Sequence, residues 1–332
     1  MKAMVQHRYG APDVLRLRDV DPPTPGDDQV LIRVHASSVN AYDWHIMRGD
    51  PYIARLSFGL RRPRAAVRGQ DFAGRVEAVG AAVTRFGPGD EVYGEAGPAG
   101  GAFAEYLCLA ENLVEAKPAN LSFAQAAAVP LAATTALVCL RDAADLRAGQ
   151  HILINGASGG VGTFAVQLAK VYGAQVTAVC RTRNVALVRS LGADHVVDYT
   201  REDFTRTDAV RAGRRYDVLL DLVGNRSLGD FRRVLTRDGT LLLSGGGVST
   251  GGSVFGPLGL LLRGPLVGRF VKQQIVAPSA TAGRGHLTVL RELVEAGKLT
   301  PVVDRTFRLS EVPDAIRYVE TEHARAKVVV TM

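Results

Sequence analysis

The sequence predicts an α/β protein that combines a β-rich domain with a doubly wound parallel sheet. Its 332 residues exceed the length at which a single hydrophobic core usually stops growing, which favours two domains. Residues 1–120 contain short strand-like runs between turn signals, whereas strands and helices alternate from about residue 121 onward. Because 47% of the residues are hydrophobic and no low-complexity run occurs, the chain can fill both cores.

The N-terminal part is expected to be a compact, mostly β lobe. The runs VLIRVHASSVN and GRVEAVG alternate apolar and polar residues, and the turn signals PPTPGDD and FGPGDEV separate such runs. The Ala-rich segment 122–146 then has helical spacing, and Ser122 is a suitable N-cap for it.

Short apolar strands separated by helices follow, which is the pattern of a parallel sheet. Strands are expected at 151–156, 175–180, 195–199, 216–224 and 240–246, with helices at 162–173 and 184–192. A helix at 286–299, ended by Gly297, precedes strand-like runs at 301–309 and 326–332. We expect these last runs to rejoin the first lobe, so that 1–122 and 299–332 form one domain and 123–298 the other.

Several classes of protein do not fit the composition. The first residues, MKAMVQHRYG, lack the apolar core and cleavage site of a secretory signal. Cys108, Cys139 and Cys180 are far apart and form no CxxC pair, which indicates neither a disulfide framework nor a zinc cluster. A reducing cytoplasm is therefore the expected location.

The net charge of the chain and its most apolar segment indicate which kinds of binding partner to expect. A net charge of +7 and a pI near 9.5 are compatible with nucleic acid or with an anionic small molecule. The densest basic run, residues 61–68, has no aromatic interleaving and is interpreted as a solvated loop, so no nucleic-acid partner is expected. Prolines and arginines interrupt the apolar stretch 254–271, which argues against a membrane span.

The stretch NGASGGVGTFAVQLAK predicts a dinucleotide-binding turn. Its pattern is AxGxxG, with Ala157 in the place of the first glycine, and it lies between an expected strand and an expected helix. Small residues there let the backbone approach a pyrophosphate, and the helix N-terminus offers free N–H groups. The expected contacts of this turn are Ala157, Ser158, Gly159, Gly160, Val161 and Gly162.

The acidic residue that normally follows such a turn by about twenty residues is missing. The chain has Arg181, Thr182 and Arg183 there instead. Guanidinium groups and a hydroxyl can bind a 2′-phosphate through charge-assisted hydrogen bonds, whereas a carboxylate would repel it. The predicted cofactor is therefore NADPH; the alternative is that both arginines are only solvated residues at a helix start.

The sequence resembles the medium-chain dehydrogenase/reductase superfamily, specifically its zinc-independent quinone oxidoreductase branch. The resemblance rests on ASGGVGTFAVQLAK, GQDFAGRVEAVG, FGPGDEVYG and AAVPLAATTALVCL, and it covers essentially the whole chain. It implies a GroES-like catalytic domain, a Rossmann domain, a substrate cleft between them and a homodimer. It also implies hydride transfer from NADPH to a quinone or an α,β-unsaturated carbonyl.

A zinc alcohol dehydrogenase is the alternative within this superfamily. Alcohol oxidation benefits from a Lewis acid that lowers the hydroxyl pKa, whereas quinones and enones accept hydride without a metal. By resemblance, the zinc ligands correspond to residues 40–43 and to Gln70-Asp71, and no four-cysteine loop follows FGPGDEVYG. No metal is therefore expected, and Asp43 with His45 is interpreted as a polar pair.

Catalysis should then depend on placing the nicotinamide against the acceptor in a dry cleft. By resemblance, Asn40 lies beside the nicotinamide, with Tyr42 and Asp43 on the same loop. The Asn40 amide would stabilise developing negative charge, or it would only fix its own loop; both interpretations stay open. His45, Tyr42 and water are equal candidates for the proton donor.

Further cofactor contacts follow from strand ends and from the resemblance. Strand-end residues of a doubly wound sheet face the ligand, which predicts contacts from Val223, Gly224, Ser244, Gly245 and Gly246. Thr134 is expected at the nicotinamide phosphate or ribose and Tyr199 beside adenine. Lys327 resembles the C-terminal lysine of the family, with solvent exposure as the alternative.

The apolar insert 254–271 has two interpretations. Phe255, Leu258, Leu260 to Leu262 and Phe270 form either a hydrophobic lid for a lipophilic acceptor or ordinary packing between domains or subunits. For the whole chain, two other classes stay open beside the enzyme: an NADPH-binding sensor without turnover and a nucleic-acid-binding protein.

Overall fold

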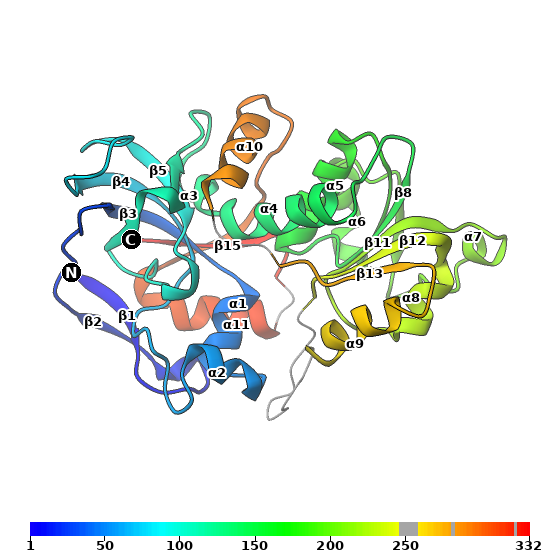
Figure 1. Cartoon of the computed structure of the whole chain (residues 1–332), viewed down its shortest axis with the longest axis horizontal. Helices are drawn as coiled ribbons and strands as arrows, with labels where there is room; N and C mark the ends of the chain where they lie inside the picture. The colour runs from blue at the N-terminus through cyan, green and yellow to red at the C-terminus, as the bar shows by residue number, and fades with distance from the viewer. Residues whose placement is uncertain (246–257, 280–282, 322–323) are drawn as a thin grey trace. The chain divides into compact units, whose positions relative to one another are not determined.

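The computed structural model describes residues 1–245, 258–279, 283–321 and 324–332, apart from the side chains of Leu258 and Leu262. Its chain forms two compact units, Met1–Thr134 with Thr281–Met332 as unit 1 and Thr135–Ala280 as unit 2 (Figure 1). These borders differ from the expected ones at residues 122 and 298. Helices α3 (Phe123–Ala127) and α10 (Arg284–Glu295), which the sequence placed in the second domain, belong to unit 1.

Specific contacts explain why α10 joins unit 1. The buried Tyr93 hydroxyl donates a hydrogen bond to the carbonyl of Leu287, 2.7 Å away. The Asn120 amide donates to the carbonyl of Val294 at 2.9 Å, and Arg291 pairs with the buried Glu115 at 2.9 Å. Sequence periodicity identifies such a helix but does not show which sheet it covers.

Most strand pairs of unit 1 are antiparallel, and one pair near the end of the chain is parallel. A hairpin of β1 (Lys2–Gln6) and β2 (Leu15–Asp19) lies beside a larger sheet with the order β14-β15-β3-β4-β5-β7, in which β6 also pairs with β3. The strands of that sheet are β3 (Gln29–Val39), β4 (Asp71–Val79), β5 (Glu91–Glu95), β6 (Tyr106–Ala110), β7 (Val114–Ala116), β14 (Val303–Arg308) and β15 (Lys327–Thr331). The last strand of the chain, β15, therefore lies directly against β3, between it and β14.

Helices complete unit 1. They are α1 (Ala41–Arg48), α2 (Arg55–Phe58), α3, α10 and α11 (Val312–Thr321), and α4 (Pro130–Leu137) crosses into unit 2. Ser122 caps α3 as expected, because its hydroxyl accepts the N–H of Gln125. Gly297 follows α10 with a positive φ of 67°, the conformation that ends helices.

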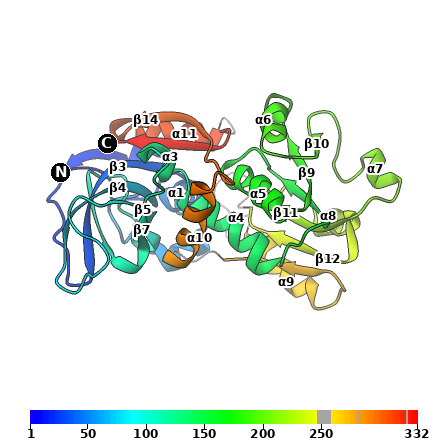
Figure 2. The same ribbon diagram turned by 90° about the horizontal axis from the view of Figure 1, so that it is seen from above.

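Unit 2 contains a fully parallel sheet with the order β10-β9-β8-β11-β12-β13. Strands β9, β10, β11 and β12 of this sheet are labelled in Figure 2. Its strands are β8 (His151–Asn155), β9 (Gln175–Cys180), β10 (His195–Asp198), β11 (Tyr216–Asp221), β12 (Leu235–Leu243) and β13 (Gln274–Val276). Its helices are α5 (Gly160–Val171), α6 (Val185–Ser190), α7 (Asp208–Arg211), α8 (Leu228–Val234) and α9 (Leu258–Gly268). This order places a topological switch point between β8 and β11, the position where doubly wound sheets bind ligands.

Some side chains of the apolar insert 254–271 are packed in the core and others are exposed. Leu260 and Leu261 in α9 pack against the hydrophobic core of unit 2, whereas Phe270 is 89% exposed. Phe255 lies outside the described residues. Within the described part of the chain, no helix has the length and apolar character needed to cross a membrane.

Candidate active site and cofactor-binding turn

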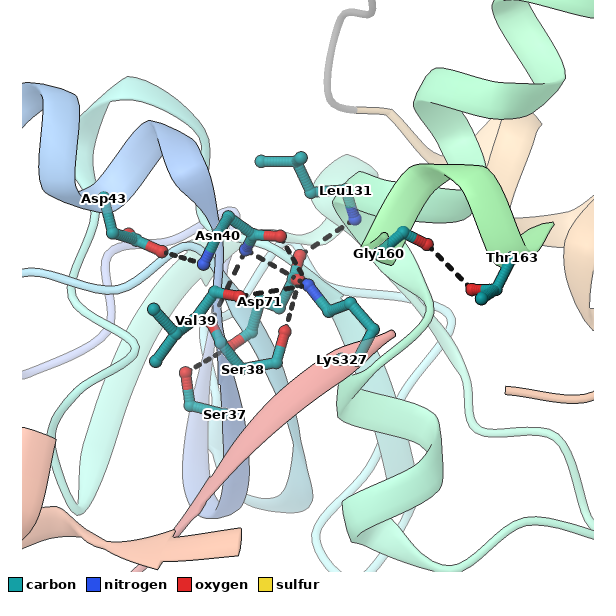
Figure 3. A network of polar contacts seen from close by, with 10 residues as sticks. All are labelled: Ser37, Ser38, Val39, Asn40, Asp43, Asp71, Leu131, Gly160, Thr163 and Lys327. Atoms are coloured by element: carbon teal, nitrogen blue, oxygen red, sulfur yellow. Dashed lines mark hydrogen bonds and ion pairs between the residues drawn. The ribbon is translucent and has the colours of Figure 1, made fainter. Parts of the chain in front are cut away.

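A buried polar network in unit 1 is centred on Asp71, the first residue of β4 (Figure 3). Its Oδ2 accepts hydrogen bonds from Ser38 Oγ at 2.6 Å, Asn40 Nδ2 at 3.0 Å and Lys327 Nζ at 3.2 Å. Its Oδ1 accepts the backbone N–H of Leu131 at 2.9 Å. Since both oxygens are paired, the carboxylate is fixed in one orientation.

Strand register brings these residues together. Asp71 lies opposite Ser38 in the β3–β4 pair, and Val328, next to Lys327, lies opposite Val39 in the β15–β3 pair. Asp71 is 0% exposed and Lys327 is 2% exposed. The interpretation of Lys327 as a solvent-exposed residue is therefore wrong.

Asn40 is held by this network on both sides of its amide. Nδ2 donates to Asp71, and Oδ1 accepts from the Lys327 ammonium, which also contacts the Val39 carbonyl at 3.4 Å. The ammonium donor fixes which amide atom is oxygen. These contacts favour the interpretation that Asn40 orders its loop over the interpretation that its N–H binds the acceptor.

Two further carboxyl groups adjoin the network. Asp43 is buried and its Oδ2 accepts the backbone N–H of Asn40 at 2.8 Å, which fixes the start of α1. Glu95 lies directly opposite Asp71 in the β4–β5 pair, so both side chains are on one face of the sheet. Burial raises the pKa of Asp43 to about 7 and that of Glu95 to about 8. At neutral pH this region therefore retains carboxyl protons.

Tyr42 presents a hydroxyl with no hydrogen-bond partner among the described residues. Its ring meets Phe58 edge-on, with 5.8 Å between centroids. Burial raises its pKa to about 12, so the hydroxyl stays protonated. It is therefore a hydrogen-bond donor available to a ligand.

Two polar atoms near these groups are also unsatisfied. Arg68 is 4% exposed and gives a hydrogen bond to the Ala65 carbonyl, but its Nε has no acceptor in the described structure. Gln70 Oε1 is buried without a donor there. Ser38, Arg68 and Glu95 could not be assigned to the site from the sequence, because their proximity depends on strand pairing.

The contacts of His45 and Asp43 do not pair them with each other. A His45 ring nitrogen lies 2.9 Å from the carbonyl of Asp50, and Asp43 is occupied by Asn40. No group of three or more His, Cys, Asp or Glu side chains within the described residues could hold a metal ion.

The glycine turn of unit 2 connects β8 to α5. Gly156 has a φ of 89°, and a Cβ on Gly162 would lie 2.2 Å from the Gly156 carbonyl oxygen, so only glycine allows this close packing. A Cβ on Gly159 would meet only that oxygen, at 3.4 Å. Thr163 Oγ1 bonds the Gly160 carbonyl at 3.1 Å in the first turn of α5 (Figure 3).

Side chains next to the turn hold it in place. Ser158 Oγ accepts a hydrogen bond from Asn184 Nδ2 at 2.9 Å, which ties the turn to the segment after β9. Asn155 Nδ2 donates to Asp221 Oδ1 at 2.8 Å across the β8–β11 switch point. The turn that precedes the free N–H groups at the start of α5 is therefore held in place by hydrogen bonds to neighbouring segments.

The strand-end residues expected at the cofactor meet at the same edge of the sheet. Asp221 accepts the N–H groups of Val223 and Gly224 at 3.2 and 3.0 Å, and its carbonyl accepts the Ser244 N–H at 2.9 Å. A Cβ on Gly245 would lie 2.4 Å from the carbonyl carbon of Leu222. Gly246 lies outside the described residues.

The end of β9 carries one feature that the sequence did not predict. Arg181, Thr182 and Arg183 are exposed, but the Thr182 hydroxyl donates to Asp198 Oδ2 at 2.5 Å. Asp198 ends β10 directly opposite Cys180, and the Thr182 hydrogen bond lowers the pKa of its carboxyl. A neighbouring strand therefore supplies a carboxylate to a region where the linear sequence has none. Tyr199, the next residue, is 44% exposed.

The residues fit a dinucleotide in unit 2. The turn has no side chain that blocks the approach of phosphate, and the helix N-terminus provides unpaired N–H groups. Thr134 and Lys327, two further expected contacts, are buried residues of unit 1. All three donors of the Lys327 ammonium have partners in that unit.

The parallel sheet, its switch point and this turn define a dinucleotide-binding protein with a second, β-rich unit. Residues 26–119 match the model of the alcohol dehydrogenase GroES-like domain, and residues 191–330 match a model described as zinc-binding dehydrogenase. The chain belongs to the medium-chain dehydrogenase/reductase superfamily, in its quinone oxidoreductase branch.

Individual relatives span nearly all of the chain. It is 38% identical to the "NADPH-dependent alkenal/one oxidoreductase, chloroplastic" of Arabidopsis thaliana, over 99% of this chain and 79% of the relative. It is 37% identical to the 2-methylene-furan-3-one reductase of Solanum lycopersicum, with the same coverage of 99% and 79%. The structure of the quinone oxidoreductase from Coxiella burnetii aligns with a TM-score of 0.85 and 32% identity, covering 100% of this chain and 99% of that one.

Proposed function

We propose that this protein is an NADPH-dependent reductase of quinones or α,β-unsaturated carbonyl compounds. The observation that carries the proposal is the glycine turn at the switch point of unit 2, in a chain whose relatives bear such names. When bound, NADPH supplies a hydride to the electrophilic acceptor.

The proposed cofactor contacts come mainly from unit 2. The N–H groups at the start of α5 bind the pyrophosphate, and Arg181 and Arg183 bind the 2′-phosphate. The strand-end residues Val223, Gly224, Ser244 and Gly245 line the remainder of the cofactor, and Tyr199 flanks the adenine.

Tyr42 is proposed as the catalytic residue on the acceptor side. Its protonated, unpartnered hydroxyl can donate a hydrogen bond to a carbonyl oxygen that becomes negative as hydride arrives. The protonated carboxyl of Glu95 is the proposed source of the proton that completes the reduction. Asn40, Asp43 and Lys327 are positioning residues, because their polar groups bond one another and Asp71.

We propose that the reaction needs no zinc. The Lys327 ammonium supplies the positive charge that faces Asp71, and an amide and a hydroxyl occupy the same carboxylate oxygen. The protein is further proposed to act as a homodimer in the cytoplasm, where its free Cys108, Cys139 and Cys180 would stay reduced.

The test is the initial rate of NADPH and NADH oxidation after chelator treatment, with a quinone, an α,β-unsaturated ketone and a simple aldehyde as acceptors. We expect turnover of the first two, with NADPH preferred. Tight NADPH binding without turnover would instead identify a sensor, and chelator-sensitive aldehyde reduction would identify a zinc enzyme.

A variant pair tests the assignment of Tyr42. Tyr42→Phe removes only the hydroxyl and is expected to lower kcat with the enone by about 10- to 100-fold, which is typical for the loss of one transition-state hydrogen bond. Ser57→Ala, at an exposed position beside the Tyr42 contact Phe58, is the control and should retain the wild-type rate. An unchanged rate in Tyr42→Phe would contradict the assignment.

A further inference from the structure

Residues 51–68 of unit 1 form a surface that is both apolar and strongly basic, here called the 51–68 surface. The segment contains five arginines and no acidic residue, and three of these arginines, Arg61, Arg62 and Arg64, are exposed. Tyr52, Leu56 and Leu60 are 44%, 63% and 68% exposed. Among the described residues, seven large hydrophobic side chains are exposed, and these three lie within the nine positions 52–60. Exposed hydrophobic side chains that cluster in one short segment are a candidate interaction site.

The 51–68 surface is held in a defined conformation. The Arg55 guanidinium packs over the rings of Tyr9 and Tyr52, at 4.7 and 4.5 Å, and donates to the carbonyl of Gly49 at 2.8 Å. The Tyr9 hydroxyl donates to the Gly59 carbonyl at 2.6 Å, and the Arg64 N–H bonds the Phe58 carbonyl at 2.9 Å. The leucines are therefore presented by a fixed backbone.

The charges of this surface are not neutralised internally. Arg61, Arg62 and Arg64 are exposed, and none forms an ion pair with a carboxylate in the described structure. Some exposed arginines elsewhere form such pairs, as Arg75 does with Glu91 at 2.9 Å and Arg233 with Asp230 at 3.0 Å. The 51–68 surface therefore carries a local positive charge with which an anionic partner can pair.

We propose that the 51–68 surface docks the protein reversibly on an anionic lipid bilayer. Leucine side chains gain free energy by entering the boundary between headgroups and acyl chains, while arginines at the rim pair with lipid phosphates. Nucleic acid would satisfy the arginines but would leave Leu56 and Leu60 in water. The combination of apolar and basic exposure therefore favours the bilayer.

A contact connects this surface to the proposed site. Phe58, between the two exposed leucines, packs against the ring of Tyr42 with 5.8 Å between centroids. If the proposed function holds, docking would present lipophilic acceptors dissolved in the bilayer close to Tyr42. Docking itself does not depend on that function.

The experiment is co-sedimentation of the full chain, without cofactor or acceptor, with vesicles of phosphatidylcholine alone and of phosphatidylcholine with phosphatidylglycerol. We expect binding to the anionic vesicles only, and weaker binding as the salt concentration rises. Arg61→Ser with Arg62→Ser should lower the partition coefficient by about five-fold for each arginine, and Leu56→Ser with Leu60→Ser by at least about ten-fold.

The matched control is Arg211→Ser with Arg214→Ser, which removes two exposed arginines from unit 2 and should bind like the wild type. Circular dichroism of each variant shows whether it is folded, and the exposed positions make unfolding unexpected. Equal binding by all variants, no binding to anionic vesicles, or preference for a DNA duplex at the same salt would each overturn the proposal. Because no turnover is measured, these outcomes are independent of the proposed reductase activity.

Discussion

Asp198 and Arg183 have opposite effects on a 2′-phosphate if it binds at the end of β9. Asp198 carries a negative charge there and accepts a hydrogen bond from the Thr182 hydroxyl at 2.5 Å, while Arg183, the residue after Thr182, is exposed. We expect Arg183→Ser to weaken NADPH binding by about 10- to 100-fold and NADH binding much less, as for a lost charge-assisted hydrogen bond. Asp198→Asn should have the opposite effect and strengthen NADPH binding relative to NADH binding.

Fluorescence titration of both cofactors measures this preference. Arg189→Ser, an exposed position on α6, is the control for a general loss of positive charge. Equal weakening of NADPH and NADH by Arg183→Ser would contradict an interaction with the 2′-phosphate.

Glu95 makes the stability of the protein depend on pH. Burial raises the pKa of its carboxyl to about 8 in the folded state, from an ordinary value near 4.5. Between these values the folded state holds a proton that the unfolded state has released, so the contribution of Glu95 to stability is lost as the pH rises from about 4.5 to 8.

Glu95→Gln should remove that dependence. The difference in the free energy of unfolding between wild type and variant should change by at most about 1.4 kcal/mol per pH unit in this range, to the disadvantage of the wild type at high pH. Urea unfolding at several pH values measures it, with the exposed Glu77→Gln as the control. Parallel pH profiles of wild type and Glu95→Gln would refute the assignment.

At the residue scale, motifs predicted some contacts and missed others. The Gly159 to Gly162 turn was predictable because its residues are adjacent in the chain and their chemistry requires that order. The proximity of Glu95 to Asp71 was not, because it depends on the register of β4 and β5. The Asp198 carboxylate was missed for the same reason, since β10 carries it to the end of β9.

At the element scale, the two glycines of the turn have different roles: Gly162 allows helix α5 to pack closely, and Gly159 leaves room for the cofactor. Gly162→Ala would place Cβ 2.2 Å from the Gly156 carbonyl oxygen, and we expect a loss of about 1–3 kcal/mol in stability from overpacking. In Gly159→Ala the nearest atom to the new Cβ would be 3.4 Å away, so the variant should fold normally. It should bind NADPH more weakly, because the methyl group would lie where the pyrophosphate approaches the backbone.

Thermal unfolding and NADPH titration distinguish the two effects. Equal stability of Gly162→Ala and the wild type would mean that helix α5 can shift away from the turn. Unimpaired NADPH binding by Gly159→Ala would mean that the cofactor does not approach the backbone there.

The elements themselves were largely predictable, but their partners were not. Periodicity identified five of the six strands of the parallel sheet, because each is a short apolar run between turns, but it missed the short edge strand β13. Helix α10 was identified as a helix, but its assignment to unit 1 depends on Tyr93 and Glu115, which lie far away in the sequence. Tertiary contacts of this kind leave no local pattern.

At the scale of the whole molecule, the Lys327–Asp71 pair joins residues 256 positions apart. Lys327→Met would leave the buried Asp71 carboxylate without its cation, and we expect a loss of about 3–5 kcal/mol in stability. Lys327→Met combined with Asp71→Asn removes both charges and should recover much of that loss. Urea unfolding midpoints measure both variants, and additive losses in the double variant would contradict a coupled pair.

The position of β15 also sets the order in which the protein can acquire its structure during synthesis. All strands of the parallel sheet have left the ribosome once residue 276 has emerged, whereas β3 still lacks its partner β15, which ends at residue 331. A growing chain can therefore complete the parallel sheet of unit 2 before Lys327 is available to pair with Asp71. Translation that stops early would release a chain with a finished nucleotide-binding sheet and an unpaired edge at residues 36–39 of β3, and such unpaired edges favour aggregation.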